Sequence, residues 1–113
     1  MMQAKTDRGA PLSVALGSGY VDLSQKDLEE RMGTVVKAVQ DGKKVVIDLI
    51  GIKGVRGDVY GTLFQRLQEN YEDDSTALDA ARSITLLFSS KADSAYKSYQ
   101  RGYEGIFTVE FKG

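Results

Sequence analysis

The chain contains no cysteine and no histidine among its 113 residues. The absence of cysteine excludes disulfides and thiol chemistry, and it fits a reducing compartment. The absence of histidine removes the commonest general base of enzymes and the usual soft metal ligand. Catalytic triads and zinc sites are therefore excluded, and we expect no catalytic residue, no metal ion and no cofactor.

Neither sign of charge dominates, because 15 Lys and Arg stand against 16 Asp and Glu. No overall field draws such a chain to nucleic acid, which is not an expected partner. No apolar run approaches the roughly 20 residues of a membrane-spanning helix. The first residues, MMQAKTDRGAP, also lack the hydrophobic core of a signal peptide. We therefore expect a soluble cytoplasmic protein without membrane insertion.

Two segments carry apolar residues at helical spacing. The first spans 24–41, with Ser24 as its N-cap and Gly42 as its C-cap glycine. The second follows a glycine-rich loop, begins near Asp58 and ends near Asn70. A third helix is expected from Ser89 or Ser90 to a closing Gly102. Its inward residues are Ala92, Ala95, Tyr96 and Tyr99.

Three other segments have the composition of strands: KKVVIDLIGI, SITLLF and IFTVEF. The unbroken apolar run of the first predicts a central strand of a parallel sheet, covered on both faces. The length of 1–113 fits a single domain, with an edge hairpin over 1–11 and an acidic loop insertion over 71–82. The alternation of strands and helices predicts an α/β layer fold.

Three stretches, in this order and spacing, resemble the STAS domain of bacterial anti-sigma factor antagonists and sulfate transporter tails. They are GYVDLSQKDLEERM, VVIDLIGIKGVRGDVYGTLFQRL and ITLLFSSKADSAYKSYQRGYEGIFTVEF. Gly19–Asp22 matches a Gly-x-Leu-Asp turn with valine for leucine, and Asp48–Gly51 matches Asp-Leu-Ser-Gly with isoleucine for serine. The resemblance implies a single-layer mixed sheet of four to five strands with helices packed mainly on one side.

In the antagonists the loop before the second helix reads Asp-Ser-Ser-Gly-Leu-Gly, and the partner kinase phosphorylates its second serine. Counted without gaps from Asp48, Asp58 stands at the phosphoacceptor position, and Arg56 and Gly57 replace the two residues before it. The later glycine is matched by Gly61. An aspartate carries about one negative charge where phosphoserine carries about 1.5 to 2. The resemblance thus implies a partial, permanent mimic of the phosphorylated state.

Aspartate is also a preferred N-cap residue, which stabilises a helix by roughly 1 kcal/mol over alanine. The residues do not decide between capping and mimicry of phosphoserine as the role of Asp58, and the two roles are compatible. Ser24 and Thr62 are hydroxyls near the same surface and are candidate substitute phosphoacceptors. The residues that the resemblance implies for partner binding are Asp22, Ser24, Arg56, Gly57, Asp58, Tyr60, Gly61 and Thr62.

The predicted function is that of a non-enzymatic regulatory domain that binds a protein. The resemblance implies that the partner is an anti-sigma Ser/Thr kinase or another STAS-binding protein, in a pathway of transcription regulation by a sigma factor. The alternative is a STAS scaffold or accessory subunit of a transporter or stress-sensing complex, in which loss of the phosphoacceptor is expected. The sequence also leaves a homodimer open.

Overall fold

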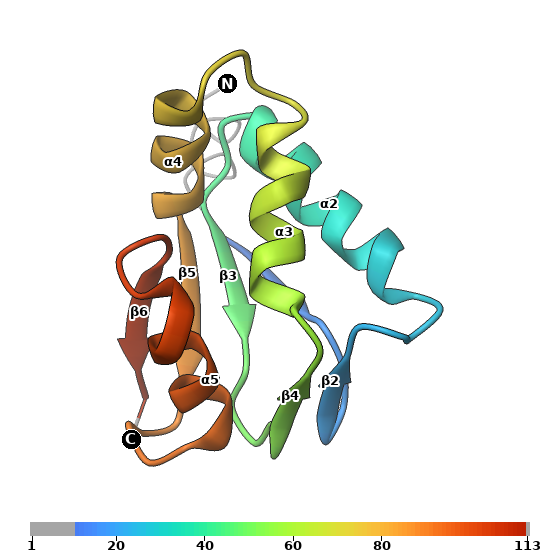
Figure 1. Cartoon of the computed structure of the whole chain (residues 1–113), viewed down its shortest axis with the longest axis vertical. Helices are drawn as coiled ribbons and strands as arrows, with labels where there is room; N and C mark the ends of the chain where they lie inside the picture. Colours follow the sequence, from blue (N-terminus) through green and yellow to red (C-terminus); the bar gives the residue numbers. More distant parts are fainter. Residues whose placement is uncertain (1–10, 113) are drawn as a thin grey trace, which may run out of the picture.

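The computed structural model describes residues 11–112 (Figure 1). Four strands form one sheet in the order β1-β3-β5-β6. A second sheet, here called the ribbon, pairs two short strands, β2 and β4, in parallel. The α/β class and the single-layer sheet are confirmed. The sheet was expected to be mixed, but all neighbouring strands of the four are parallel. The strands are β1 (Leu12–Ala15), β2 (Tyr20–Asp22), β3 (Val45–Asp48), β4 (Gly54–Arg56), β5 (Ile84–Phe88) and β6 (Thr108–Phe111).

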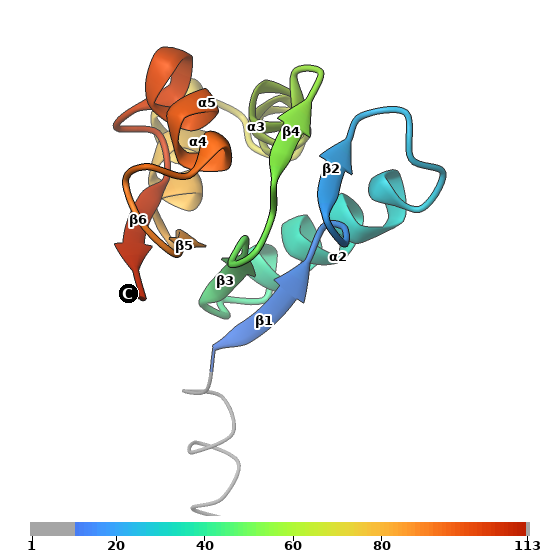
Figure 2. The ribbon, with the colours of Figure 1, turned by 90° about the horizontal axis from the view of Figure 1, so that it is seen from below.

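The helices gather on one face of the four-stranded sheet, as Figure 2 shows. They are α2 (Leu28–Gln40), α3 (Val59–Gln68), α4 (Asp74–Arg82) and α5 (Ser94–Tyr103). The expectation of helices mainly on one side is confirmed, whereas helical cover on both faces of β3 was a wrong prediction. Along β3, Val45 and Ile47 are buried, while Val46 between them is only half-buried. Successive residues of a strand point to opposite faces, so this alternation reflects the one-sided cover.

The buried side chains form one cluster between the sheet and the helices. In the strand register, Ile47 of β3 lies between Val14 of β1 and Leu86 of β5. The helical spacing noted in the sequence supplies the opposing layer, because the buried residues of α2 and α3 are those at one-turn intervals. They include Met32, Val35, Val36, Val39, Val59, Leu63 and Leu67.

The first helix ends as predicted and begins later than predicted. At its end Gly42 has φ +82°, its amide donates to Val39, and the Lys43 amide donates to Ala38. This pair of bonds is the Schellman arrangement, which requires the left-handed conformation that glycine adopts easily. At its beginning Ser24 is not the N-cap, because α2 starts at Leu28 after Asp27. Ser24 instead belongs to a turn closed by Asp22.

Two further helix boundaries correct the sequence predictions. Residues 74–82 of the expected acidic loop form α4, because the Asp73 carboxylate accepts the Thr76 amide and so begins a helix. The next helix, α5, begins after Asp93 rather than at Ser89 or Ser90. It continues through Gly102 to Tyr103, and the positive-φ glycine beyond it is Gly105. The hairpin expected over 1–11 lies almost wholly outside the described residues.

Candidate functional site

The candidate site lies on the ribbon and on the amino end of α3, at the end of the sheet toward which β3 points (Figure 1). The ribbon is held in register by three residue pairs, in which Tyr20 lies opposite Gly54 and Asp22 lies opposite Arg56. Its inner residue, Val21, is fully buried. The outer positions therefore present Tyr20, Asp22 and Arg56 to solvent on one face.

An aromatic–cation contact dominates this outer face. The guanidinium carbon of Arg56 lies 4.4 Å from the centre of the Tyr20 ring, which is within the range of a cation–π interaction. Tyr20 remains 43% exposed. A side chain at Gly54 would lie 3.3 Å from the Tyr20 ring, so glycine lets the ring rest against the neighbouring strand. Arg56 is thus exposed on the ribbon, and its contact with Tyr20 was not foreseen.

The turn after β2 is closed by Asp22. Its carboxylate accepts hydrogen bonds from the Ser24 amide at 3.0 Å and from the Ser24 hydroxyl at 2.9 Å. These two donors hold the pKa of the Asp22 carboxyl below its ordinary value. Gln25 continues the turn, because its side chain accepts the Asp22 amide and donates to the Leu16 carbonyl, both at 2.9 Å. Asp22 and Ser24 therefore lie together at this site, with both side chains occupied in shaping the turn.

Gly57 connects the ribbon to α3 in a conformation that requires glycine. Its φ is +81°, and a Cβ atom there would lie 2.8 Å from the Cβ of Leu23. Leu23 is itself 39% exposed, an unusual position for a leucine. The chain before α3 therefore passes directly under Leu23, whose amide donates to the Arg56 carbonyl at 3.0 Å. We call Tyr20, Asp22, Leu23, Arg56 and Asp58 the ribbon face.

Asp58 is the N-cap of α3 and is exposed. Its Oδ1 accepts the Gly61 amide at 3.2 Å, and the Tyr103 hydroxyl donates to the same oxygen. This hydrogen bond raises the pKa of the Tyr103 phenol. A Cβ at Gly61 would lie 2.5 Å from Oδ2 and 2.6 Å from Oδ1 of Asp58, so glycine provides the space for the carboxylate. The prediction that a helix begins at Asp58 is confirmed.

Two predicted contact residues after Asp58 have different positions. Tyr60 is only 3% exposed, and its hydroxyl donates to the Ala95 carbonyl at 2.9 Å. Burial raises the pKa of the Tyr60 phenol. Because the side chain is buried, the prediction of Tyr60 as a direct partner contact is wrong. It faces inward because it lies one turn from Leu63 and Phe64, on the core side of α3. Thr62 lies near the surface, where its hydroxyl donates to the Asp58 carbonyl at 2.6 Å.

Sequence reasoning missed three contributors to this site: Tyr20, Leu23 and Tyr103. Tyr20 begins a strand of three residues and Leu23 follows it, and such a strand is too short to show a period-two pattern. Tyr103 lies 45 residues beyond Asp58, and no local pattern relates the two. A third exposed apolar side chain, Ile50, follows β3 at the same end of the sheet and is 39% exposed. Four large exposed hydrophobic residues occur within 11–112, and three of them are Tyr20, Leu23 and Ile50.

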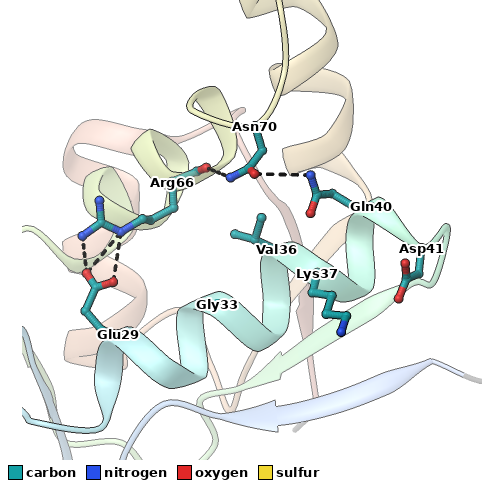
Figure 3. Close-up of a pocket in the computed structure, with 8 residues that line it drawn as sticks. All are labelled: Glu29, Gly33, Val36, Lys37, Gln40, Asp41, Arg66 and Asn70. Atoms are coloured by element: carbon teal, nitrogen blue, oxygen red, sulfur yellow. Dashed lines mark hydrogen bonds and ion pairs between the residues drawn. The ribbon is translucent and has the colours of Figure 1, made fainter.

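A cleft of about 460 Å³ lies elsewhere, between α2 and α3 (Figure 3). Gly33 and Val36 of α2 line it, and polar side chains bridge it at two points. Arg66 lies with its Nε 3.1 Å from both carboxylate oxygens of Glu29, and the Gln40 amide is 3.4 Å from that of Asn70. These pairs join the two helices, and the cleft contains none of the predicted site residues.

Comparison with known proteins returned no matching family model, no matching curated protein and no matching solved structure. Within residues 11–112, no helix combines the length and apolar character needed to cross a membrane. The same residues contain no group of three or more His, Cys, Asp or Glu side chains arranged to hold a metal ion.

Proposed function

We propose that this chain is a non-enzymatic regulatory domain of STAS type that binds a protein partner through the ribbon face. The observation that carries the proposal is the exposed Tyr20 with Arg56 over its ring, next along the chain to Gly57, which packs under the exposed Leu23 and leads into Asp58. Tyrosine and arginine are enriched among the residues that dominate binding at protein interfaces. The exposed Leu23 beside Gly57 adds apolar area that a partner would remove from water.

The partner in this proposal is an ATP-binding anti-sigma Ser/Thr kinase, and the setting is the cytoplasm. Its basis is the resemblance of the Asp48–Gly61 segment to the loop that such a kinase phosphorylates in the antagonists. The position of Asp58 supports this reading, because the amino end of a helix that favours a carboxylate also favours a phosphate group. A negative charge at this position weakens docking when a partner removes water from it without supplying a cation. Asp58 then keeps the interaction permanently weaker than an unmodified serine would.

Photo-crosslinking from the ribbon face tests the docking proposal. A photoreactive phenylalanine analogue in place of Tyr20 keeps the aromatic ring beside Arg56. The control carries the same analogue in place of Asp79, which is exposed on α4 at the other end of the molecule (Figure 1). In a lysate of the source organism, the Tyr20 probe should cross-link to a protein with an ATP-binding kinase domain, and the Asp79 probe should not. Equal labelling from both positions, or no product from Tyr20, would contradict docking at the ribbon face.

A second candidate, a scaffold or accessory subunit, is favoured by the state of the hydroxyl groups near Asp58. The Thr62 hydroxyl donates to the Asp58 carbonyl, and the Ser24 hydroxyl donates to Asp22, so both serve local structure. Without a serine at position 58, docking in this candidate is not controlled by phosphorylation. The cross-linked partner would then be a transporter ATPase or another assembly protein.

A serine substitution separates the two candidates. Asp58→Ser restores a hydroxyl at the position of the phosphoacceptor, and Asp73→Ser makes the same change at the N-cap of α4. With radiolabelled ATP and the cross-linked partner, the kinase proposal predicts label on Asp58→Ser and none on the wild type or Asp73→Ser. Label on all three proteins or on none would contradict it, and absence of label with a transporter ATPase as partner would favour the scaffold.

A further inference from the structure

The Asp58 carboxylate is held by groups from two different helices. The Gly61 amide belongs to the first turn of α3, and the Tyr103 hydroxyl belongs to the last turn of α5. Both donate to Oδ1. Within residues 11–112, none of the three ion pairs includes Asp58. The only side chain in this part of the chain that bonds the carboxylate is therefore a neutral phenol.

Tyr103 is itself anchored in the core by other aromatic rings. Its ring centre lies 5.9 Å from that of Tyr60, and the Tyr60 centre lies 5.5 Å from that of Tyr99. Tyr60 and Tyr99 are 3% and 1% exposed, and both have hydroxyl groups bonded to backbone carbonyls. Tyr103 is half-buried against this cluster of rings, and its hydroxyl lies at Asp58 on the edge of the ribbon face.

Gly61 provides the space in which the Asp58 carboxylate lies over the first turn of α3. Any side chain at this position would require the carboxylate to move, because a Cβ would approach both of its oxygens to within 2.6 Å. Helix formation alone disfavours glycine relative to alanine. A glycine here therefore makes the helix less stable while leaving space for the carboxylate under Tyr103.

We propose that Tyr103 is a positioning residue of the ribbon face, which holds the Asp58 carboxylate against the amino end of α3 and replaces water as its donor when a partner docks. This inference rests on the proposed docking function. A carboxylate that enters an interface loses hydrogen bonds from water, and this loss weakens binding unless protein groups supply replacements. Tyr103 supplies one such bond before the partner arrives. It thereby makes an acidic residue tolerable within a docking surface.

The test combines a structural readout with the cross-linking assay. The variants are Tyr103→Phe, Asp58→Asn and the double variant, and the matched control is Tyr96→Phe. Tyr96 also lies on α5, with its ring packed against Phe88 and Phe111, and no hydrogen bond of its hydroxyl is found within the described part of the chain. NMR titration of the tyrosine rings should find a raised pKa for the Tyr103 phenol in the wild type and in Tyr96→Phe. In Asp58→Asn this pKa should return toward its ordinary value.

In cross-linking from position 20, Tyr103→Phe should lower the yield severalfold, while Tyr96→Phe should leave it unchanged. Asp58→Asn removes the charge and should raise the yield, and adding Tyr103→Phe to Asp58→Asn should then have no further effect. An equal loss in both Asp58 backgrounds would show that Tyr103 acts independently of the carboxylate and would overturn the inference. An unshifted Tyr103 phenol would also overturn it. Absence of any product from the wild type would instead contradict the docking function itself, whatever the titration gives.

Discussion

All four helices within residues 11–112 have an aspartate N-cap, but only Asp58 and Asp73 accept an amide of their own helix with the side chain. These two amino ends differ in what holds the carboxylate. At α4, Asp73 accepts the Thr76 amide at 2.7 Å and the Thr76 hydroxyl at 2.9 Å, so both donors come from one residue of the same turn. At α3, Asp58 accepts the Gly61 amide at the longer distance of 3.2 Å and a hydroxyl from a helix 45 residues away. Capping is complete at Asp73 without any distant partner.

The backbone shows the same contrast. Asp73 has the extended conformation of an ordinary N-cap, with φ −135° and ψ 159°. Asp58 has φ −86° and ψ 65°, and the Val59 amide donates across it to the Gly57 carbonyl at 3.0 Å. This is an inverse γ-turn, which follows directly on the positive φ of Gly57. The amino end of α3 thus combines a specialised turn, a glycine for space and a tyrosine donor, which a cap by itself does not require.

The largest effect on stability is expected at the glycine that leads into Asp58. Gly57→Ala should lower the free energy of unfolding by about 2–5 kcal/mol, since positive φ costs about 1–2 kcal/mol and overpacking against Leu23 adds about 1–3 kcal/mol. Gly51→Ala is the matched control, because Gly51 has the same φ of +81° with no atom within 4 Å of the added Cβ. It should cost only the conformational part, about 1–2 kcal/mol. Urea denaturation of both variants measures the difference, and equal losses would contradict the close packing of Leu23.

The two amino ends should affect the pH dependence of stability in opposite pH ranges, Asp73 in acid and the Tyr103–Asp58 pair in alkali. The Thr76 donors hold the pKa of Asp73 below its ordinary 3.8, so its contribution is present above that pH and is lost as the pH falls through the lower folded value. The bond to Asp58 raises the pKa of Tyr103 above its ordinary 10.0, so that contribution is present below pH 10 and is lost as the pH rises.

Single variants of these two groups should each flatten one side of the stability profile. Asp73→Asn should reduce the loss of stability in acid without changing the alkaline side, and Tyr103→Phe should do the reverse. Asp22 and Glu29 still titrate in acid, and Tyr60 and Tyr99 still titrate in alkali, so each variant removes only part of the loss. Urea midpoints measured across the pH range provide the test. If Tyr103→Phe left the alkaline side unchanged, its hydroxyl would not be bonded to Asp58 in solution.

The smallest effect is expected from two glycines within helices. Gly33→Ala in α2 should raise the free energy of unfolding by about 0.5–1 kcal/mol, because alanine has the higher helix propensity and no atom lies within 4 Å of the added Cβ. Gly61→Ala in α3 has the same advantage in propensity, but it displaces the Asp58 carboxylate from Gly61 and Tyr103. We therefore expect no net gain, together with a lower pKa of the Tyr103 phenol in NMR titration. A gain equal to that of Gly33→Ala would contradict the role of Gly61.

The parts of the fold that the sequence predicted are those with a long hydrophobic period. Apolar residues at helical spacing predict α2 and α3, and apolar runs predict β3 and β5. Each of these elements buries its apolar residues against the same core. α4 was predicted as a loop because its inward residues are alanines, Ala77 and Ala81, which give little hydrophobic contrast. Its start, Asp73 followed three residues later by Thr76, is a recognisable cap, but the acidic run around it resembles a solvated loop.

The candidate site was predictable only where it is local. Asp58 precedes an amphipathic segment, so its place at the amino end of a helix followed from the sequence. The ribbon was not predictable, because it joins two three-residue strands from separate parts of the chain. Tyr60 was assigned to the surface by its nearness to Asp58 in the loop motif, although the helical period places it inside. Tyr103 reaches Asp58 only through the packing of α5, which no short pattern records.

The most direct test of the account compares the same substitution at the two caps. Asp58→Asn and Asp73→Asn each remove one negative charge and leave a residue that can still cap a helix. In cross-linking from position 20, the account predicts that Asp58→Asn raises the yield of the partner complex and that Asp73→Asn leaves it at the wild-type level. An unchanged yield in Asp58→Asn, or the same rise in both variants, would show that Asp58 is a helix cap and has no part in docking.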